Sequence, residues 1–202
     1  MPLTQPVPEL ETPPVNANPR RVVAALFTVG LCGAAGCGAS PSPTASTPAP
    51  ATPAASFGGT DRAWLEINIA MDEELLPLLD LAPANARDPA LKQLSAQFKV
   101  LTADELSTLR RLHDEAGLPA VNPHKGMPMP GMVTPSLVAE AAGQRGAAFD
   151  SLLTRSLREH LEQGQMLAGS EQSSGAETRT KELAASILKS RATTLAQLKK
   201  DS

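Results

Sequence analysis

Four side chains that can bind a soft metal ion lie within nine residues of the sequence. They are His124, Met127, Met129 and Met132, in the segment HKGMPMPGM. Thioether sulfurs favour Cu(I), and imidazole also suits copper. An exposed loop with these donors could capture copper outside a membrane. The alternative is a simple connector, in which Met132 docks on the folded domain and the prolines stiffen the chain, because methionine commonly fills gaps in a core.

Polar residues also interrupt the apolar stripes of the predicted helices, at about the same level along each helix. They are Asp72, Glu105, His160 and Arg191, and Met71 occupies the position that corresponds to His160. Because a buried charge needs a partner, we expect Arg191 to pair with Glu105. A single histidine is a poor ligand set, so we expect His160 to be a partly buried imidazole that is neutral or paired. If a metal binds at this level, Met71, Asp72 and His160 are its candidate ligands.

The sequence does not indicate other chemistry. The chain has only three histidines, and no phosphate-binding loop or dinucleotide fingerprint occurs in it. Its formal net charge is −3, whereas a nucleic-acid-binding domain carries a basic patch. We therefore expect neither an enzyme nor a nucleic-acid-binding protein.

Four long helices must position these residues. We predict helices over about 60–81, 88–117, 146–172 and 176–202, and a short helix after Thr134-Pro135. Asp88-Pro89 and Thr134-Pro135 are each typical of an N-cap followed by proline at the first helical position. Gly117 is typical of the residue that ends a helix.

The helices form a hairpin that occurs twice in the sequence. An offset of 89 positions aligns identical residues in both helices: Asp61 with Asp150, Lys92 with Lys181, and Leu106 with Leu195. The apolar stripe predicted for the second helix comprises Leu91, Leu94, Phe98, Leu101, Leu109 and Leu112. The apolar stripe of one hairpin must be buried against another element, and the second hairpin can provide it. We therefore predict that residues 60–202 form an all-α four-helix bundle from two duplicated hairpins.

The residues before this domain carry export signals. An uncharged apolar run over 22–36 follows Arg20 and Arg21. It is shorter than the roughly 20 residues of a membrane span and typical of a signal peptide. The small residues before Cys37 resemble the bacterial lipobox, whereas the bulky Leu31 makes Cys32 a poorer fit. We expect a signal peptide with a long n-region over 1–36 and lipidation of Cys37. The alternatives to this lipoprotein interpretation are an uncleaved signal anchor and a simple secreted protein.

Residues 37–59 are rich in Pro, Ala, Ser and Thr. Such a tract cannot bury enough apolar surface to fold, so we expect a disordered tether. The tether would hold the domain on the extracytoplasmic face of the cell membrane.

The hairpin repeat, the lipobox and the segment HKGMPMPGMVTPS resemble the domain-of-unknown-function 305 (DUF305) family. Its fold is ferritin-like, and its members are often exported bacterial lipoproteins, some of them associated with copper. Asp61 and Trp64 match the family pattern in the first half, and Asp150 and His160 match it in the second. Glu105 matches the family glutamate, while other residues replace the remaining polar positions.

Two functional hypotheses follow. The first is a membrane-tethered, non-enzymatic bundle that binds a protein partner or serves the cell envelope. The second is a binder of copper or another metal through the Met/His loop, with Met71, Asp72 and His160 as further ligands. Oxidoreductase chemistry at a ferritin-like di-metal centre ranks last, because the last two long helices lack the required Glu-x-x-His ligands.

Overall fold

The structure, a computed structural model, describes residues 56–200, which form five α-helices and no strand. The helices are α1 (Gly59–Asn85), α2 (Pro89–Glu115), α3 (Pro135–Ala142), α4 (Ala147–Ser174) and α5 (Thr178–Lys200). The predicted all-α fold is confirmed. Cys37, the signal peptide over 1–36 and most of the tether over 37–59 lie outside the described residues. Within these residues, no helix combines the length and the apolar character that a membrane span needs.

Sequence signals at the helix ends act as predicted. The Asp88 side chain accepts a hydrogen bond from the Ala90 N–H at 2.9 Å and starts α2. The Thr134 hydroxyl accepts from the Leu137 N–H at 3.3 Å and starts α3. Each cap satisfies one of the backbone donors that a helix start leaves unpaired.

Helix α1 extends beyond its predicted end at residue 81 and contains both Pro77 and Pro83. A proline inside a helix removes one backbone hydrogen bond. Tertiary contacts hold the last turn nevertheless. The Asn85 side chain donates to the Ala141 carbonyl at 3.2 Å, and the Asn85 carbonyl accepts from the Gly146 N–H at 2.9 Å.

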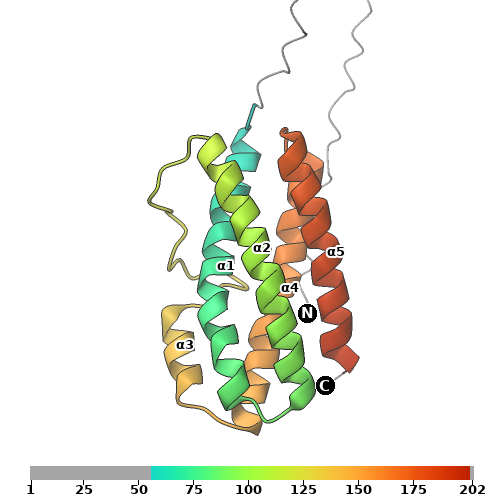
Figure 1. The fold of residues 1–202 in the computed structure, drawn as a ribbon. Helices are drawn as coiled ribbons and strands as arrows, with labels where there is room; N and C mark the ends of the chain where they lie inside the picture. Colours follow the sequence, from blue (N-terminus) through green and yellow to red (C-terminus); the bar gives the residue numbers. More distant parts are fainter. Residues whose placement is uncertain (1–55, 201–202) are drawn as a thin grey trace, which may run out of the picture. The chain divides into compact units, whose positions relative to one another are not determined.

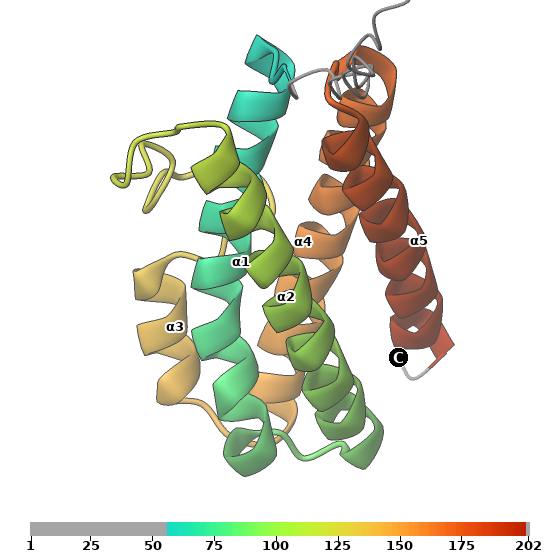
Figure 2. The same cartoon turned by 45° about the horizontal axis from the view of Figure 1, so that its top comes forward.

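The long helices form two hairpins that pack face to face (Figures 1 and 2). Helix α1 pairs with α2, and α4 pairs with α5. Between the hairpins, α1 contacts α4, and α2 contacts α5. The short helix α3 packs on the outer side of α1. This arrangement is the predicted four-helix bundle.

The bundle core contains two large apolar clusters, one towards each end. One cluster contains Leu75, Phe98 and Leu157 with their neighbours. The other contains Trp64, Leu109 and Ile187 with their neighbours. Between these clusters, each long helix contributes a polar side chain: Asp72, Glu105, His160 and Arg191. We call these four residues the central layer.

One stripe position was predicted wrongly. Leu101 is 42 % exposed, and the neighbouring Thr102 is buried in its place. Four residues after the buried Phe98, the inward face of α2 reaches position 102, so position 101 points aside. The polar Thr102 is buried there because this turn of α2 lies at the level of the central layer.

The duplication is visible in the contacts at the two ends of the bundle. Asp150, at the start of α4, accepts hydrogen bonds from the N–H groups of Arg87 and Asp88 at 3.0 and 3.2 Å. Asp61, at the start of α1, accepts from Ala176 and Glu177, both at 3.0 Å. All three residues of one set lie 89 positions from their counterparts in the other. Each hairpin therefore holds the interhelical turn of the other.

Candidate functional site

Arg191 of α5 lies at the middle of the central layer and bridges two carboxylates. Its Nη2 atom is 2.8 Å from Glu105 Oε2 and 3.3 Å from Asp72 Oδ1. The guanidinium also lies over the Phe98 ring, with Cζ 4.9 Å from the ring centroid. Gly164 on α4 provides the space, because a Cβ there would lie 3.2 Å from Arg191 Nε. Arg191 is thus paired with Glu105, and Asp72 is a second partner that the sequence reasoning had not assigned.

Burial controls the protonation of Asp72, whose residue is only 1 % exposed. Loss of solvation raises the pKa of the Asp72 carboxyl to about 7; Arg191 lowers it and Glu105 raises it further. Desolvation disfavours the charged form, while a nearby cation favours it. Asp72 is therefore poised between its neutral and its charged form near neutral pH.

His160 is a fully buried, neutral imidazole. Burial, and then the charge of Arg191, lower the pKa of His160 to about 3, while a backbone contact with Gly131 acts in the opposite direction. His160 Nε2 lies 3.7 Å from Asp72 Oδ1, too far for a hydrogen bond. The ring packs edge-on against Phe98, with the centroids 6.1 Å apart. His160 is buried more fully than the sequence suggested.

The linker between the hairpins is held against the bundle near His160. Gly131 has a φ angle of +74°, and a Cβ there would lie 2.6 Å from the Gln163 Cβ and 2.8 Å from the Glu159 carbonyl oxygen. Only glycine fits both this backbone conformation and this close approach. The linker therefore passes over α4 in direct contact with its backbone.

The linker is also bound to α1 by polar contacts. The Asn122 side chain donates to the Glu66 carbonyl at 2.7 Å. The Gly126 N–H donates to the buried Glu74 carboxylate at 2.5 Å, and Lys125 Nζ lies 3.4 Å from Glu73. These contacts fix the segment with the soft metal donors along one side of the bundle.

The predicted metal-binding residues separate into two groups. Met132 is buried, Met129 is half-buried, and both pack with Met71 of α1 in one apolar cluster that also contains Ala70. In contrast, Met127 is 44 % exposed, and the half-buried His124 is not part of this cluster. We call Met71, Met129 and Met132 the methionine cluster.

The central layer does not fit a metal ion. Arg191 already places a positive charge at the carboxylate of Asp72, and a second cation would be repelled there. Over residues 56–200, no three His, Cys, Asp or Glu side chains converge in a metal-binding arrangement. The methionine cluster is different, because its three thioethers carry no competing charge and suit Cu(I).

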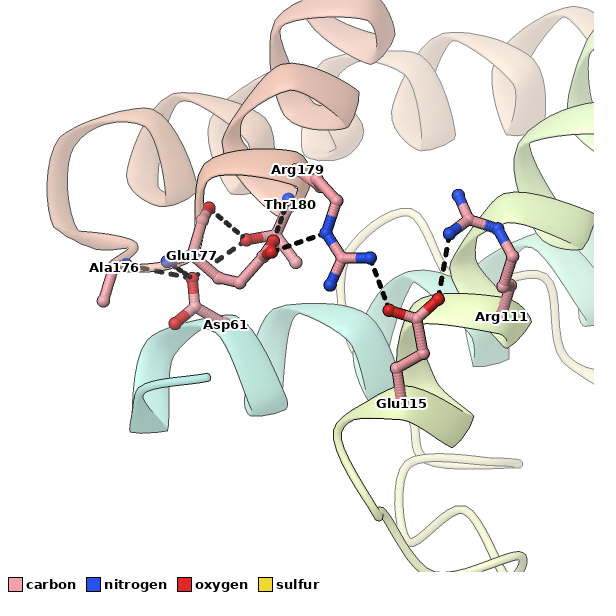
Figure 3. A network of polar contacts seen from close by, with 7 residues as sticks. All are labelled: Asp61, Arg111, Glu115, Ala176, Glu177, Arg179 and Thr180. Carbon is pink, nitrogen blue, oxygen red and sulfur yellow. Dashed lines mark hydrogen bonds and ion pairs between the residues drawn. The ribbon is translucent and has the colours of Figure 1, made fainter. Parts of the chain in front are cut away.

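A second buried polar group lies where α1 begins, and the sequence reasoning missed it (Figure 3). Besides its backbone bonds, Asp61 accepts from the Thr180 hydroxyl at 3.0 Å. Arg179 binds both Glu177 of the turn and Glu115 of α2. Arg111 in turn binds Glu115 at 3.0 Å. This network ties the starts of α1 and α5 to the end of α2.

Glu171, near the end of α4, completes this group. It is fully buried, and neither of its carboxyl oxygens has a hydrogen-bond donor. Burial and the adjacent Asp61 carboxyl raise the pKa of Glu171 to about 7. Burial would also raise the pKa of Asp61, but its hydrogen bonds outweigh this effect and lower it to about 2. A sequence signal did exist, since Glu171 lies three residues after the buried Ala168 and so on the inward face of α4.

Solved structures of other proteins share this fold, among them two DUF305 proteins and CopM. A DUF305 protein from Streptomyces coelicolor that is assigned as secreted is 17 % identical, with a TM-score of 0.61 over 69 % of this chain and 89 % of the other. A DUF305 fragment from Deinococcus radiodurans is 11 % identical, with a TM-score of 0.63 over 71 % and 95 %. CopM in its Cu(II)-bound form is 17 % identical, with a TM-score of 0.55 over 69 % and 93 %. At these identities the similarity shows the fold alone.

Among curated proteins, none matches this chain significantly. The family model described as "Domain of unknown function (DUF305)" matches residues 60–201, which span the whole helical bundle. The predicted family is confirmed: this chain belongs to the DUF305 family.

Proposed function

We propose that this chain is a lipid-anchored, extracytoplasmic protein whose bundle binds a protein partner or serves the envelope without catalysing a reaction. One observation carries the proposal: Arg191 pairs with the carboxylates of both Asp72 and Glu105 within the central layer. At the level where family members carry polar residues, this chain has a buried ion group whose charged members pair with one another. Such a group stabilises a fold but offers no site for a substrate.

The burial of the layer supports the same conclusion. Asp72, His160 and Arg191 are each 1 % exposed, so no substrate reaches them in this conformation. Catalysis by acid–base transfer requires a side chain within hydrogen-bond reach of the reacting group. The lipid anchor rests on the small residues Ala34, Ala35 and Gly36 before Cys37. The secreted assignment of the Streptomyces relative agrees with a place outside the cytoplasm.

Metabolic labelling tests the anchor. Cells that express the full chain receive an alkyne palmitate, and the purified protein is examined for label and for membrane association. We expect label in the wild type and in Cys32→Ala, and neither label nor membrane association in Cys37→Ala. Label that persists in Cys37→Ala would contradict lipidation at this residue.

Complementation of a deletion strain tests the non-catalytic role. The Asp72→Leu/Glu105→Gln/Arg191→Met variant removes all three charges of the ion group and keeps the interior packed. We expect it to support every phenotype that the wild type supports, at equal protein level. Loss of the phenotype by this folded variant would indicate that the central layer takes part in chemistry.

A second candidate function is the binding of Cu(I), and the methionine cluster favours it. Met71, Met129 and Met132 come from α1 and the linker and pack together. Thioethers are soft ligands that select Cu(I). The fold similarity to the Cu(II)-bound CopM makes copper the first metal to test.

Competition with a Cu(I) chelator tests this function. The chain carries Cys32→Ser and Cys37→Ser, because free thiols would themselves bind Cu(I). If the cluster binds copper, we expect about one Cu(I) per chain, lost in Met71→Leu/Met132→Leu and retained in Met127→Leu. Leucine preserves the packing volume, so the fold should tolerate both changes. Equal copper content in all three proteins would exclude the cluster as the site.

A further inference from the structure

The two ends of the bundle are built alike, but only one carries a second buried carboxyl. At that end Asp61 holds the turn between α4 and α5, and the buried Glu171 carboxyl lies against Gly175 of the same turn. At the other end Asp150 holds the turn between α2 and α1, and the residue 89 positions before Glu171 is Ala82, which is also fully buried. The extra carboxyl is therefore a specific addition to one of two equivalent ends.

The surroundings of Glu171 keep its carboxyl inside the fold. Gly175 follows the end of α4 next to this carboxyl, and a Cβ at position 175 would overlap Glu171 Oε1. Gly58 similarly leaves space beside Asp61, since a Cβ there would lie 3.1 Å from Asp61 Oδ2. Two buried carboxyl groups in contact can share one proton, but they repel each other when both are ionised.

We propose that Asp61 and Glu171 form a proton-dependent latch, which closes the turn between α4 and α5 onto the start of α1 when Glu171 is protonated. Protonated Glu171 lies beside the ionised Asp61 without repulsion. Loss of this proton places two negative charges in a site without solvent, and the turn separates from α1. The latch is independent of the lipid anchor and of copper binding.

The other charged groups at this end do not neutralise the pair. Glu177 is bound by Arg179, which also binds Glu115 of α2. Lys181 of α5 lowers the pKa of Glu171, as does the Thr180 hydroxyl, but burial and Asp61 outweigh both. On α2, His113 Nδ1 lies 3.4 Å from Asp114, and on α1 the Arg62 Nε donates to the Phe57 carbonyl at 3.5 Å.

The sign of the pH dependence follows from linkage. The pKa of Glu171 is about 7 in the latched state and returns towards its ordinary value of 4.5 when the turn opens. The latched state thus binds an extra proton between these values. The latch is strongest near pH 4.5, weakens by up to tenfold per pH unit between about 4.5 and 7, and is constant above that. Below the ordinary pKa of 3.8 for Asp61, it weakens again, because the latched state lowers the pKa of Asp61 to about 2.

Amide hydrogen exchange tests the proposal within one molecule. The Ala176 and Glu177 N–H groups donate to Asp61, and the Arg87 and Asp88 N–H groups donate to Asp150. After correction for the intrinsic exchange rate, we expect the protection of the first pair to fall at least tenfold between about pH 5 and 7 relative to the second. If the protection of both pairs changed equally with pH, the proposed latch would be refuted.

The variant Glu171→Gln provides the matched control. A neutral amide of the same shape can donate to Asp61 at every pH, so we expect the pH-dependent difference between the two ends to disappear. This variant keeps His113 and the other titratable groups of this end unchanged. A difference that survives in Glu171→Gln would assign the effect to another group and refute the proposal.

A direct titration gives a second measurement that does not depend on exchange. The carboxyl carbon of Glu171 is followed by NMR in the full chain, and we expect its midpoint near 7. A midpoint near its ordinary value of 4.5 would refute the latch.

Discussion

Replacement of Arg191 by methionine should destabilise the bundle strongly, and by an amount that depends on pH. The guanidinium is 1 % exposed, pairs with Asp72 and Glu105, and packs on Phe98. Removing one partner of a buried ion pair leaves the other charge uncompensated and costs about 3–5 kcal/mol. We therefore expect Arg191→Met to lose about this much unfolding free energy near pH 8.5.

The loss should become smaller in mild acid. The pKa of Asp72 is about 7 with Arg191 present, and it must rise further without this cation. Near pH 5.5 the Asp72 carboxyl is neutral in both proteins, so its pairing no longer contributes to the difference. At about 1.4 kcal/mol per pKa unit, the loss near pH 5.5 should be roughly 2 kcal/mol smaller than near pH 8.5.

Urea unfolding followed by far-ultraviolet circular dichroism measures both values. The variant Asp72→Leu/Glu105→Gln/Arg191→Met is the matched control, because it leaves no unpaired charge in the central layer. It should recover to within about 1 kcal/mol of the wild type near pH 8.5. An equal loss at both pH values for Arg191→Met, or a loss below about 1 kcal/mol near pH 8.5, would refute the electrostatic reasoning.

Three further measurements test other features. Gly131→Ala should lose about 2–4 kcal/mol of unfolding free energy through backbone strain and contact with Gln163. Gly126 has the same φ of +74° but open space around it, so Gly126→Ala should lose only about 1 kcal/mol. Equal losses for the two variants would contradict the close approach of the linker to α4. Asp150→Ala should destabilise by about 1–2 kcal/mol, because two N–H groups lose their acceptor; an unchanged urea midpoint would show that water replaces it. The imidazole of His160 should stay neutral by NMR down to about pH 4, given its pKa of about 3; protonation near pH 6 would mean that the ring is solvated.

Much of the fold follows from local signals in the sequence. Asp88-Pro89 and Thr134-Pro135 start helices because a capping side chain and a fixed φ act within a few residues. The hairpin repeat was visible as identical residues at a constant offset, and the contacts of Asp61 and Asp150 preserve the same offset. Signals of this kind need no knowledge of the tertiary structure.

The errors arose where tertiary contacts decide the outcome. Helix α1 continues past Pro83 because Asn85 is bound by residues of α3 and of the turn before α4, more than fifty positions away. Thr102 rather than Leu101 is buried because the level of the central layer is fixed by the partner helices. The pairing of Arg191 with Asp72 spans 119 positions, and only the register between the two hairpins determines it.

The exchange of aspartates between the two halves has a consequence for any shorter version of this chain. A single half would present an aspartate with nothing to bind and a turn whose amides lack an acceptor. It could satisfy both needs at once only by joining an identical copy about a twofold axis. The covalent chain reproduces that symmetric pair within one molecule. Because its two halves differ in sequence, it can carry a single arginine at the centre and an additional carboxyl group at one end, which a symmetric pair of identical halves could not.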